Sequence, residues 1–261
     1  MWTAPGSVAD AAAAHGVRRL VYLSSTSVYG LPDVVPTPES HPVAPEDTYG
    51  RAKVDAESAC SKAASDELSV TVLRPKTFIG PGRLGLFSLL FEWAAAGRNF
   101  PVLGSGDVIA QLCSTEDVAA AVELVLAAPQ GEANDVYNIA SVEFGSLRDD
   151  FQAVLDAAGH GKRVISIPMG PAVPVLQALA RMRLSPVYRR LVHKLRSDSY
   201  VSIDKARAEL GFEPRQSSEE AILSAFTWWL ERQGDEELHT PGNASNNRWR
   251  QGALGLARVL F

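Results

Sequence analysis

The sequence predicts an α/β protein built around a parallel sheet. Segments with strand-like and helix-like patterns alternate along most of the chain, which is typical of α/β folds. Residues 19–24 include the apolar run Leu20, Val21, Tyr22 and Leu23. A continuous apolar run of this length indicates a strand that is buried on both faces, as in parallel sheets.

The other elements follow in a regular order. Helices are expected at residues 7–15, 49–64, 86–96, 116–127, 146–158, 202–210 and 218–232, and strands at 69–74, 136–139 and 163–167. Residues 31–47 hold five of the sixteen prolines, so this segment is expected to be a loop. Residues 171–194 are expected to form a basic and apolar helical region broken by prolines. The polar residues that follow position 235 predict a mobile tail.

Composition narrows the classes of function. The 261 residues are 46% apolar and carry a net charge of −5, and this acidic balance argues against a nucleic-acid partner. No segment reaches the roughly 18 apolar residues of a membrane span, and no signal peptide is visible. Cys60 and Cys113 lack the spacing of metal ligands. We therefore expect a cytoplasmic protein that acts on a small molecule and holds no metal.

The segment from Tyr49 to Lys53 carries the clearest chemical signal. Residues four apart lie on the same face of a helix, so Lys53 is expected beside Tyr49. A phenol has a pKa of about 10, and a neighbouring ammonium favours the phenolate and lowers that pKa. The pair predicts an acid/base group that works near neutral pH. Ser25, at the end of the strand before this helix, could hydrogen-bond the same substrate oxygen.

Six motifs follow one another along the chain: Ser24-Ser-Thr-Ser-Val-Tyr-Gly30, Tyr49-Gly-Arg-Ala-Lys53, the Arg74-Pro75 to Gly82 loop, Ser114-Thr-Glu-Asp-Val118, Tyr137-Asn-Ile139 and the segment from Asp204 to Pro214. In order and spacing they resemble the motifs of the NAD-dependent epimerase/dehydratase family of extended short-chain dehydrogenases/reductases. The resemblance covers about residues 7–232. It implies a Rossmann-like, doubly wound parallel sheet, shortened at its N-terminus, and a smaller C-terminal α/β substrate-binding region. The expected division is 1–145, 146–234 and a tail at 235–261.

The resemblance also implies roles for individual residues and a cofactor, NAD or NADP. Ser25, Tyr49 and Lys53 would be catalytic. Ser24, Tyr49, Lys53, Pro75, Thr77, Phe78 and Ile79 would bind the cofactor, and Ser25, Thr26, Ser27 and Gln111 would contact a small-molecule substrate. A homodimer is a further possibility that the family's helices suggest.

The sequence departs from the family pattern in three places. The Gly-x-x-Gly-x-x-Gly turn that binds the pyrophosphate is missing, and the similar run from Gly80 to Gly85 belongs to a later loop. Thr26 and Ser27 stand where sugar-nucleotide 4,6-dehydratases carry Asp and Glu. Ala110 lies near a position where many nucleotide-sugar enzymes carry a diphosphate-binding Arg, for which alanine cannot substitute.

Three readings therefore stay open. The first is an NAD(P)-dependent oxidoreductase or epimerase. The second is a truncated relative or gene fragment without activity, which acts at most as a binding protein. The third is a nucleotide-sugar epimerase that binds a UDP group in spite of Ala110.

Overall fold

The computed structural model describes residues 4–129, 132–170 and 198–233. These residues form two compact units that alternate along the chain. The first unit takes its residues from within 1–78, 111–142 and 200–215, and the second from within 79–110, 143–199 and 216–261. The helical region expected at 171–194 and the tail expected after 235 lie outside the described residues.

A three-stranded parallel sheet forms the centre of the first unit. Its strands are β1 (Arg19–Leu23), β2 (Ser69–Pro75) and β6 (Val136–Ile139), in the order β1-β2-β6. Val21 pairs with Thr71, and Val72 pairs with Val136, so all three strands run in the same direction. The α/β class with a parallel sheet, predicted from the sequence, is confirmed.

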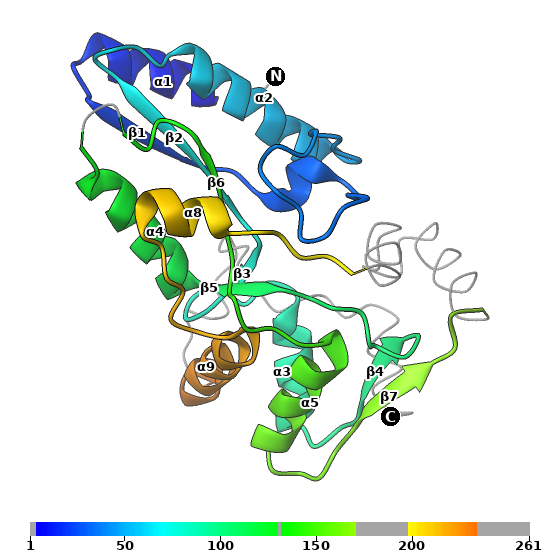
Figure 1. Ribbon diagram of the computed structural model, residues 1–261. Coiled ribbons are helices and arrows are strands. Elements are labelled where there is room, and N and C mark those ends of the chain that lie inside the picture. Colours follow the sequence, from blue (N-terminus) through cyan, green and yellow to red (C-terminus); the bar gives the residue numbers. More distant parts are fainter. Residues whose placement is uncertain (1–3, 130–131, 171–197, 234–261) are drawn as a thin grey trace. The chain divides into compact units, whose positions relative to one another are not determined.

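Helices cover both faces of this sheet (Figure 1). They are α1 (Ala4–Ala14) and α2 (Thr48–Lys62) on one side and α4 (Thr115–Ala127) and α8 (Asp204–Leu210) on the other. Side chains of a strand alternate between its two faces. Leu20 and Tyr22 accordingly pack with Ala9 of α1 and Cys60 of α2, whereas Val21 packs into the core on the opposite face.

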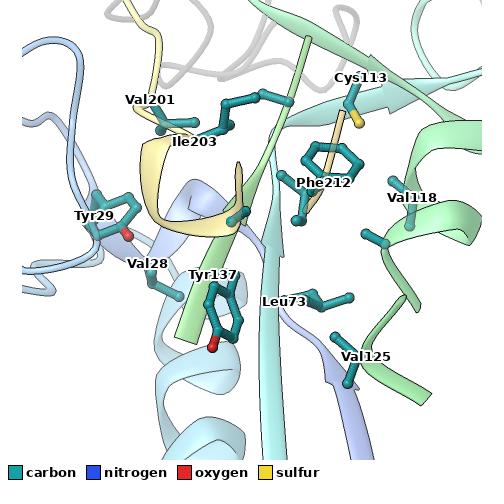
Figure 2. Close-up of a cluster of buried hydrophobic side chains, with 14 residues drawn as sticks. Val28, Tyr29, Leu73, Cys113, Val118, Val125, Tyr137, Val201, Ile203 and Phe212 are labelled. Carbon is teal, nitrogen blue, oxygen red and sulfur yellow. The ribbon is translucent and has the colours of Figure 1, made fainter. Parts of the chain in front are cut away.

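The larger core of the first unit lies between the sheet and α4 (Figure 2). Leu73 and Tyr137 enter it from neighbouring strands, and Val118 and Val125 enter it from α4. Phe212, which follows α8, is fully buried among them. The chain returns to this core after residue 200, so the last part of the first unit closes over the sheet that its earlier parts build.

Two further strands of this region escaped the sequence-based prediction. β3 (Thr77–Ile79) and β5 (Leu112–Ser114) pair with each other. Each contains only three residues, and neither shows the alternating or continuous apolar pattern that identifies longer strands. β5 leads directly into α4, whose first turn is capped by the Ser114 side chain.

Among its described residues, the second unit pairs two parallel strands with three helices. The strands are β4 (Phe100–Leu103) and β7 (Val164–Ile167), and the helices are α3 (Phe87–Ala95), α5 (Leu147–Ala157) and α9 (Ser218–Glu231). Phe100 lies 5.5 Å, centroid to centroid, from both Trp93 of α3 and Phe151 of α5. Phe91 similarly packs on Phe226 at 5.2 Å. This aromatic cluster holds the three helices together.

Arg19, at the start of β1, closes the C-terminal end of α4. Its guanidinium donates hydrogen bonds to the carbonyls of Val125 at 2.7 Å, Ala128 at 2.9 Å and Pro129 at 2.7 Å. The last carbonyls of a helix have no partner inside it, and a cation at this end also interacts favourably with the helix dipole. Arg19 therefore satisfies several backbone groups at once.

We predict that Arg19→Lys lowers the free energy of unfolding by about 1–2 kcal/mol, because an ammonium cannot reproduce the planar fork of donors. Urea unfolding followed by circular dichroism measures the effect. Arg51→Ala is the control: Arg51 is exposed and makes one long bond, of 3.4 Å, to the Glu46 carbonyl. We expect this control to change stability by less than about 0.5 kcal/mol. Equal stability of Arg19→Lys and the wild type would contradict the prediction.

Asp150 of α5 is a buried carboxyl group of the second unit. It is 2% exposed, and no described residue bonds its Oδ2 atom. Burial, together with the charges of Glu219 and Asp149, raises its pKa from 3.8 to about 7. The folded state therefore holds this proton where the unfolded state has lost it. The stabilisation linked to this proton is complete below about pH 4. It falls as the pH rises from about 4 and is lost once the pH has passed through 7.

We predict that Asp150→Asn, a neutral group of the same shape, is more stable than the wild type at pH 8 by about 1–4 kcal/mol. The difference should shrink towards pH 5, where Asp150 is protonated. Denaturant unfolding across this pH range measures it. Asp156→Asn, on the exposed face of the same helix, should show no such pH dependence. A difference that stays constant from pH 5 to pH 8 would sink the prediction.

Candidate active site

Tyr49 and Lys53 lie in the first two turns of α2. The Asp47 side chain caps this helix by accepting a hydrogen bond from the Gly50 N–H at 2.6 Å. Tyr49 is 49% exposed. The Lys53 ammonium lies 5.8 Å from the centre of the Tyr49 ring, as the spacing of four residues predicted. The pair therefore shares one helix face that reaches solvent.

The Lys53 ammonium is held against the end of β1. Its Nζ donates a 2.7 Å hydrogen bond to the Leu23 carbonyl and lies 5.0 Å from the centre of the Tyr22 ring. Burial raises the pKa of Tyr22 to about 12, and the nearby Cys60 and Glu57 add to the shift. Tyr22 thus stays a neutral phenol at physiological pH, although it lies close to the same ammonium as Tyr49.

The serine-rich segment begins where β1 ends. Ser25 caps the short 3₁₀ helix η1 (Thr26–Tyr29), and its Oγ accepts a hydrogen bond from the Ser27 N–H at 3.2 Å. The Oγ atoms of Ser25 and Ser27 lie 3.0 Å apart. Ser24 turns in the other direction and donates its hydroxyl hydrogen bond to Glu57 in the interior. The Ser25 side chain therefore bonds within η1, whereas the side chain of its neighbour Ser24 bonds in the interior.

Gly50 lets α2 approach η1 closely. A Cβ atom at this position would lie 2.8 Å from Pro45 Cβ and 2.9 Å from the Ser27 carbonyl oxygen, closer than real Cβ contacts. Only glycine can follow Tyr49 without a shift of the helix or of η1. The first turn of α2 is thus fixed against the segment that carries Ser25 and Ser27.

The other predicted cofactor residues lie at and after the end of β2. Pro75 is buried as the last residue of that strand, next to β6. In β3, Thr77 is exposed, Phe78 is partly buried and Ile79 is fully buried. Thr77 is consequently the member of this group whose side chain is most open to solvent.

Gln111 is buried and fully engaged with main-chain groups. Its side-chain amide donates to the Ser141 carbonyl at 2.7 Å, and its side-chain oxygen accepts from the Val201 N–H at 2.9 Å. A substrate contact by Gln111 would have to replace one of these bonds. Thr26, the remaining predicted substrate residue, lies in η1 beside Ser25 and Ser27.

A buried polar network lies beneath these residues, and its roles were not predicted from the sequence. Arg74 donates two hydrogen bonds to the Glu57 carboxylate, from Nη2 at 2.6 Å and from Nε at 3.0 Å. Its Nη1 donates to the Tyr29 hydroxyl at 2.9 Å, and Tyr29 donates to Asn138 at 2.8 Å. Burial raises the pKa of Tyr29, which keeps its hydroxyl available as a donor. Two features of the sequence could have indicated this network: the position of Glu57, four residues after Lys53, and the Arg74-Pro75 motif.

Other kinds of site are not indicated within the described ranges. No group of three His, Cys, Asp or Glu side chains there could hold a metal ion. In the same part of the chain, no helix combines the length and the apolar character that crossing a bilayer requires.

A family model named NAD dependent epimerase/dehydratase family matches residues 3–140. The chain belongs to this family. The match covers more than half of the chain and includes the β1 end, η1, α2 and β2, which carry most of the candidate site. The resemblance read from the motifs is therefore confirmed, and so is the Rossmann-like class of the fold.

Individual relatives support the assignment. The uncharacterized protein y4nG of Sinorhizobium fredii (strain NBRC 101917 / NGR234) is 36% identical over 225 residues, which are 85% of this chain and 56% of that protein. The dTDP-glucose 4,6-dehydratase of Streptomyces antibioticus is 28% identical over 84% of this chain and 60% of its own length. The chain thus spans less than two thirds of either relative.

A solved structure shows the same fold. The enzyme WbmG of Bordetella bronchiseptica, in complex with NAD and UDP, superposes with a TM-score of 0.67 at 23% identity. The superposition covers 87% of this chain and 63% of WbmG. At this level of identity the likeness concerns the fold, including its parallel α/β architecture.

Proposed function

We propose that this chain carries the acid/base part of an NAD(P)-dependent site that oxidises a secondary hydroxyl of a small substrate or reduces the corresponding ketone. The observation that carries the proposal is the Tyr49–Lys53 pair, whose ammonium bonds the Leu23 carbonyl at the carboxyl end of β1, two residues before Ser25. Open α/β sheets bind their ligands at this edge. An epimerase would use the same groups in both directions at one carbon.

The residues present suit the nicotinamide–ribose end of the cofactor. Lys53 is a partly buried residue whose ammonium N–H donors match ribose hydroxyls, and Thr77 and Phe78 follow the end of the neighbouring strand β2. The bound cofactor would supply a hydride acceptor or donor. The glycine turn expected to hold the pyrophosphate is not among the motifs of this sequence.

The protein's own groups divide the remaining work. Tyr49 would take the proton from the substrate hydroxyl as the hydride leaves the carbon, and it would return that proton in the reduction. The Lys53 ammonium, 5.8 Å from the centre of the Tyr49 ring, would stabilise the charge that develops during this transfer. The Ser25 hydroxyl, at the start of η1, would hold the substrate oxygen in place.

The substrate class follows from the relatives only in part. The names of the dehydratase and of the WbmG complex point to nucleotide sugars, so UDP-glucose is the first probe. Thr26 and Ser27 lack the carboxyl groups that the resemblance assigns to dehydration, which favours oxidation or epimerisation. Ala110 offers no cation for the diphosphate of a nucleotide sugar. A small substrate without a diphosphate is therefore the alternative.

We predict that Tyr49→Phe lowers turnover of UDP-glucose with NAD⁺ at least about 100-fold, because the proton acceptor is lost. Cofactor affinity should stay nearly unchanged. Tyr22→Phe is the matched control, since it removes a phenol oxygen near the same ammonium but keeps the ring that contacts Lys53. Turnover is followed as NADH absorbance and affinity as NADH fluorescence. Retained turnover in Tyr49→Phe would remove Tyr49 from its proposed role.

We also predict that Lys53→Met weakens binding of reduced nicotinamide mononucleotide about 10- to 100-fold, the range expected when a charge-assisted hydrogen bond is lost. This probe contains only the nicotinamide, its ribose and the phosphate attached to that ribose. Lys62→Met, at the exposed end of the same helix, should leave the affinity unchanged. If the wild-type chain fails to bind the probe at millimolar concentration, the reading as an inactive relative replaces the proposal.

A further inference from the structure

The candidate site rests on a buried ion pair, Glu57 with Arg74. Glu57 is 7% exposed and Arg74 is 6% exposed, and they share two hydrogen bonds. Removing two charges from water costs free energy that their mutual attraction often fails to recover, so a buried ion pair is a weak means of stabilising a fold. An apolar pair could fill the same volume. The geometry of the Glu57–Arg74 pair therefore indicates a role beyond stabilising the fold.

The position of Glu57 along α2 supplies that purpose. Tyr49, Lys53 and Glu57 are spaced four residues apart, so all three lie along one face of the helix. Glu57 accepts a hydrogen bond from the Ser24 hydroxyl, and Ser24 directly precedes Ser25. The carboxylate thus ties the helix face that bears Tyr49 and Lys53 to the strand end that bears Ser25.

Arg74 holds this carboxylate in place from the neighbouring strand. Its fork donates to both oxygens of Glu57, and its Nη1 donates to the Tyr29 hydroxyl of η1. Tyr29 in turn donates to Asn138 of β6, whose side-chain amide donates to the carbonyls of Thr37 and Ser202. One chain of hydrogen bonds therefore joins the ends of β1, β2 and β6 to α2 and η1.

We propose that Glu57 and Arg74 are positioning residues that hold Lys53 and Tyr49 in register with Ser25 through the Ser24–Glu57 hydrogen bond. The proposal rests on the proposed function for its meaning in catalysis, but the register itself is a property of the free chain. Lys53 reports on this register directly, because its Nζ bonds the carbonyl of Leu23, the residue before Ser24.

Ser24→Ala is the decisive variant. It removes the tie between strand and helix while it leaves the Glu57–Arg74 charges in place, so the electrostatic environment of Lys53 is preserved. Arg74→Ala would leave a buried carboxylate unpaired and so risks unfolding the chain. Glu57→Gln is a second variant, which keeps an acceptor for Ser24 but gives up the charge that Arg74 requires.

Thr71→Val is the matched control. Thr71 is a fully buried hydroxyl residue on β2, and it donates to the Ala133 carbonyl. Its loss removes one buried hydrogen bond from the same sheet without touching the network around Glu57. Ser24→Ala and Thr71→Val should therefore lower the midpoint of urea unfolding by similar amounts.

The test is trace acetylation of the full chain, with labelled peptides quantified by mass spectrometry. Lys62, an exposed lysine at the end of the same helix, is the internal reference. We expect the Lys53-to-Lys62 labelling ratio to rise about threefold or more in Ser24→Ala, since the loss of one buried hydrogen bond shifts a local equilibrium by a factor of this order. Glu57→Gln should also raise the ratio, because Arg74 no longer holds a carboxylate at this position, and Thr71→Val should leave it unchanged.

The outcomes separate the two proposals. An unchanged ratio in Ser24→Ala, or an equal rise in Thr71→Val, would overturn the positioning role. A rise that is specific to Ser24→Ala and Glu57→Gln supports it, whether or not the chain turns over UDP-glucose with NAD⁺. Absence of turnover in a wild-type chain with the specific labelling response counts against the proposed function alone.

Discussion

The bidentate ion pair between Glu57 and Arg74 is the interaction on which the order of the candidate site depends. It connects α2 to β2, and its partners Ser24 and Tyr29 extend it to β1 and η1. Backbone pairing alone aligns β1 with β2 but places no helix on the sheet. Apolar packing holds α2 against the sheet, yet such packing is non-directional. The hydrogen bonds of Glu57 are directional, so they can fix the position of α2 relative to the end of β1.

The same arrangement explains why small residues cluster around this point. Gly50 allows the first turn of α2 to contact η1, where any side chain would collide with Pro45 and the Ser27 carbonyl. Gly30 has a φ of 67°, and a Cβ there would lie 2.1 Å from the Ala44 carbonyl oxygen. Both glycines thus bring backbone into close contact on either side of η1. The serine-rich strand end is consequently enclosed by backbone as well as by the ion pair.

Much of the fold could be predicted from the sequence because its main elements carry strong local patterns. The strand at Val136–Ile139 was predicted with its observed bounds, and β1 and β2 differ from the prediction by one residue at one end. β4 was missed because it contains Pro101, which lacks a backbone donor, and β3 and β5 were missed because they have only three residues each. Periodicity detects an element from the pattern of its own residues. Short strands of this kind are defined by the strands they pair with, so their own residues do not reveal them.

The candidate site shows the same limit at the level of side chains. The proximity of Tyr49 and Lys53 follows from helix geometry and could be predicted from their spacing alone. Glu57 and Arg74 are 17 residues apart and Tyr29 and Asn138 are 109 apart, so no local rule pairs them. Gln111 was assigned to the substrate by resemblance, and the structure adds that its amide bonds the main chain at Ser141 and Val201. Contacts of this kind require the tertiary structure.

Two tyrosines near one lysine illustrate how burial decides which group can do chemistry. Tyr22 and Tyr49 both lie near the Lys53 ammonium, at 5.0 and 5.8 Å from their ring centres. Tyr22 belongs to the sheet, where loss of water raises its pKa to about 12 despite the cation. Tyr49 stands at the start of α2 and is half exposed, so water and a ligand can reach its oxygen. In the function proposed above, the cation assists proton transfer at Tyr49 and not at Tyr22, and this difference arises because the fold places one ring in the sheet and the other at the start of α2.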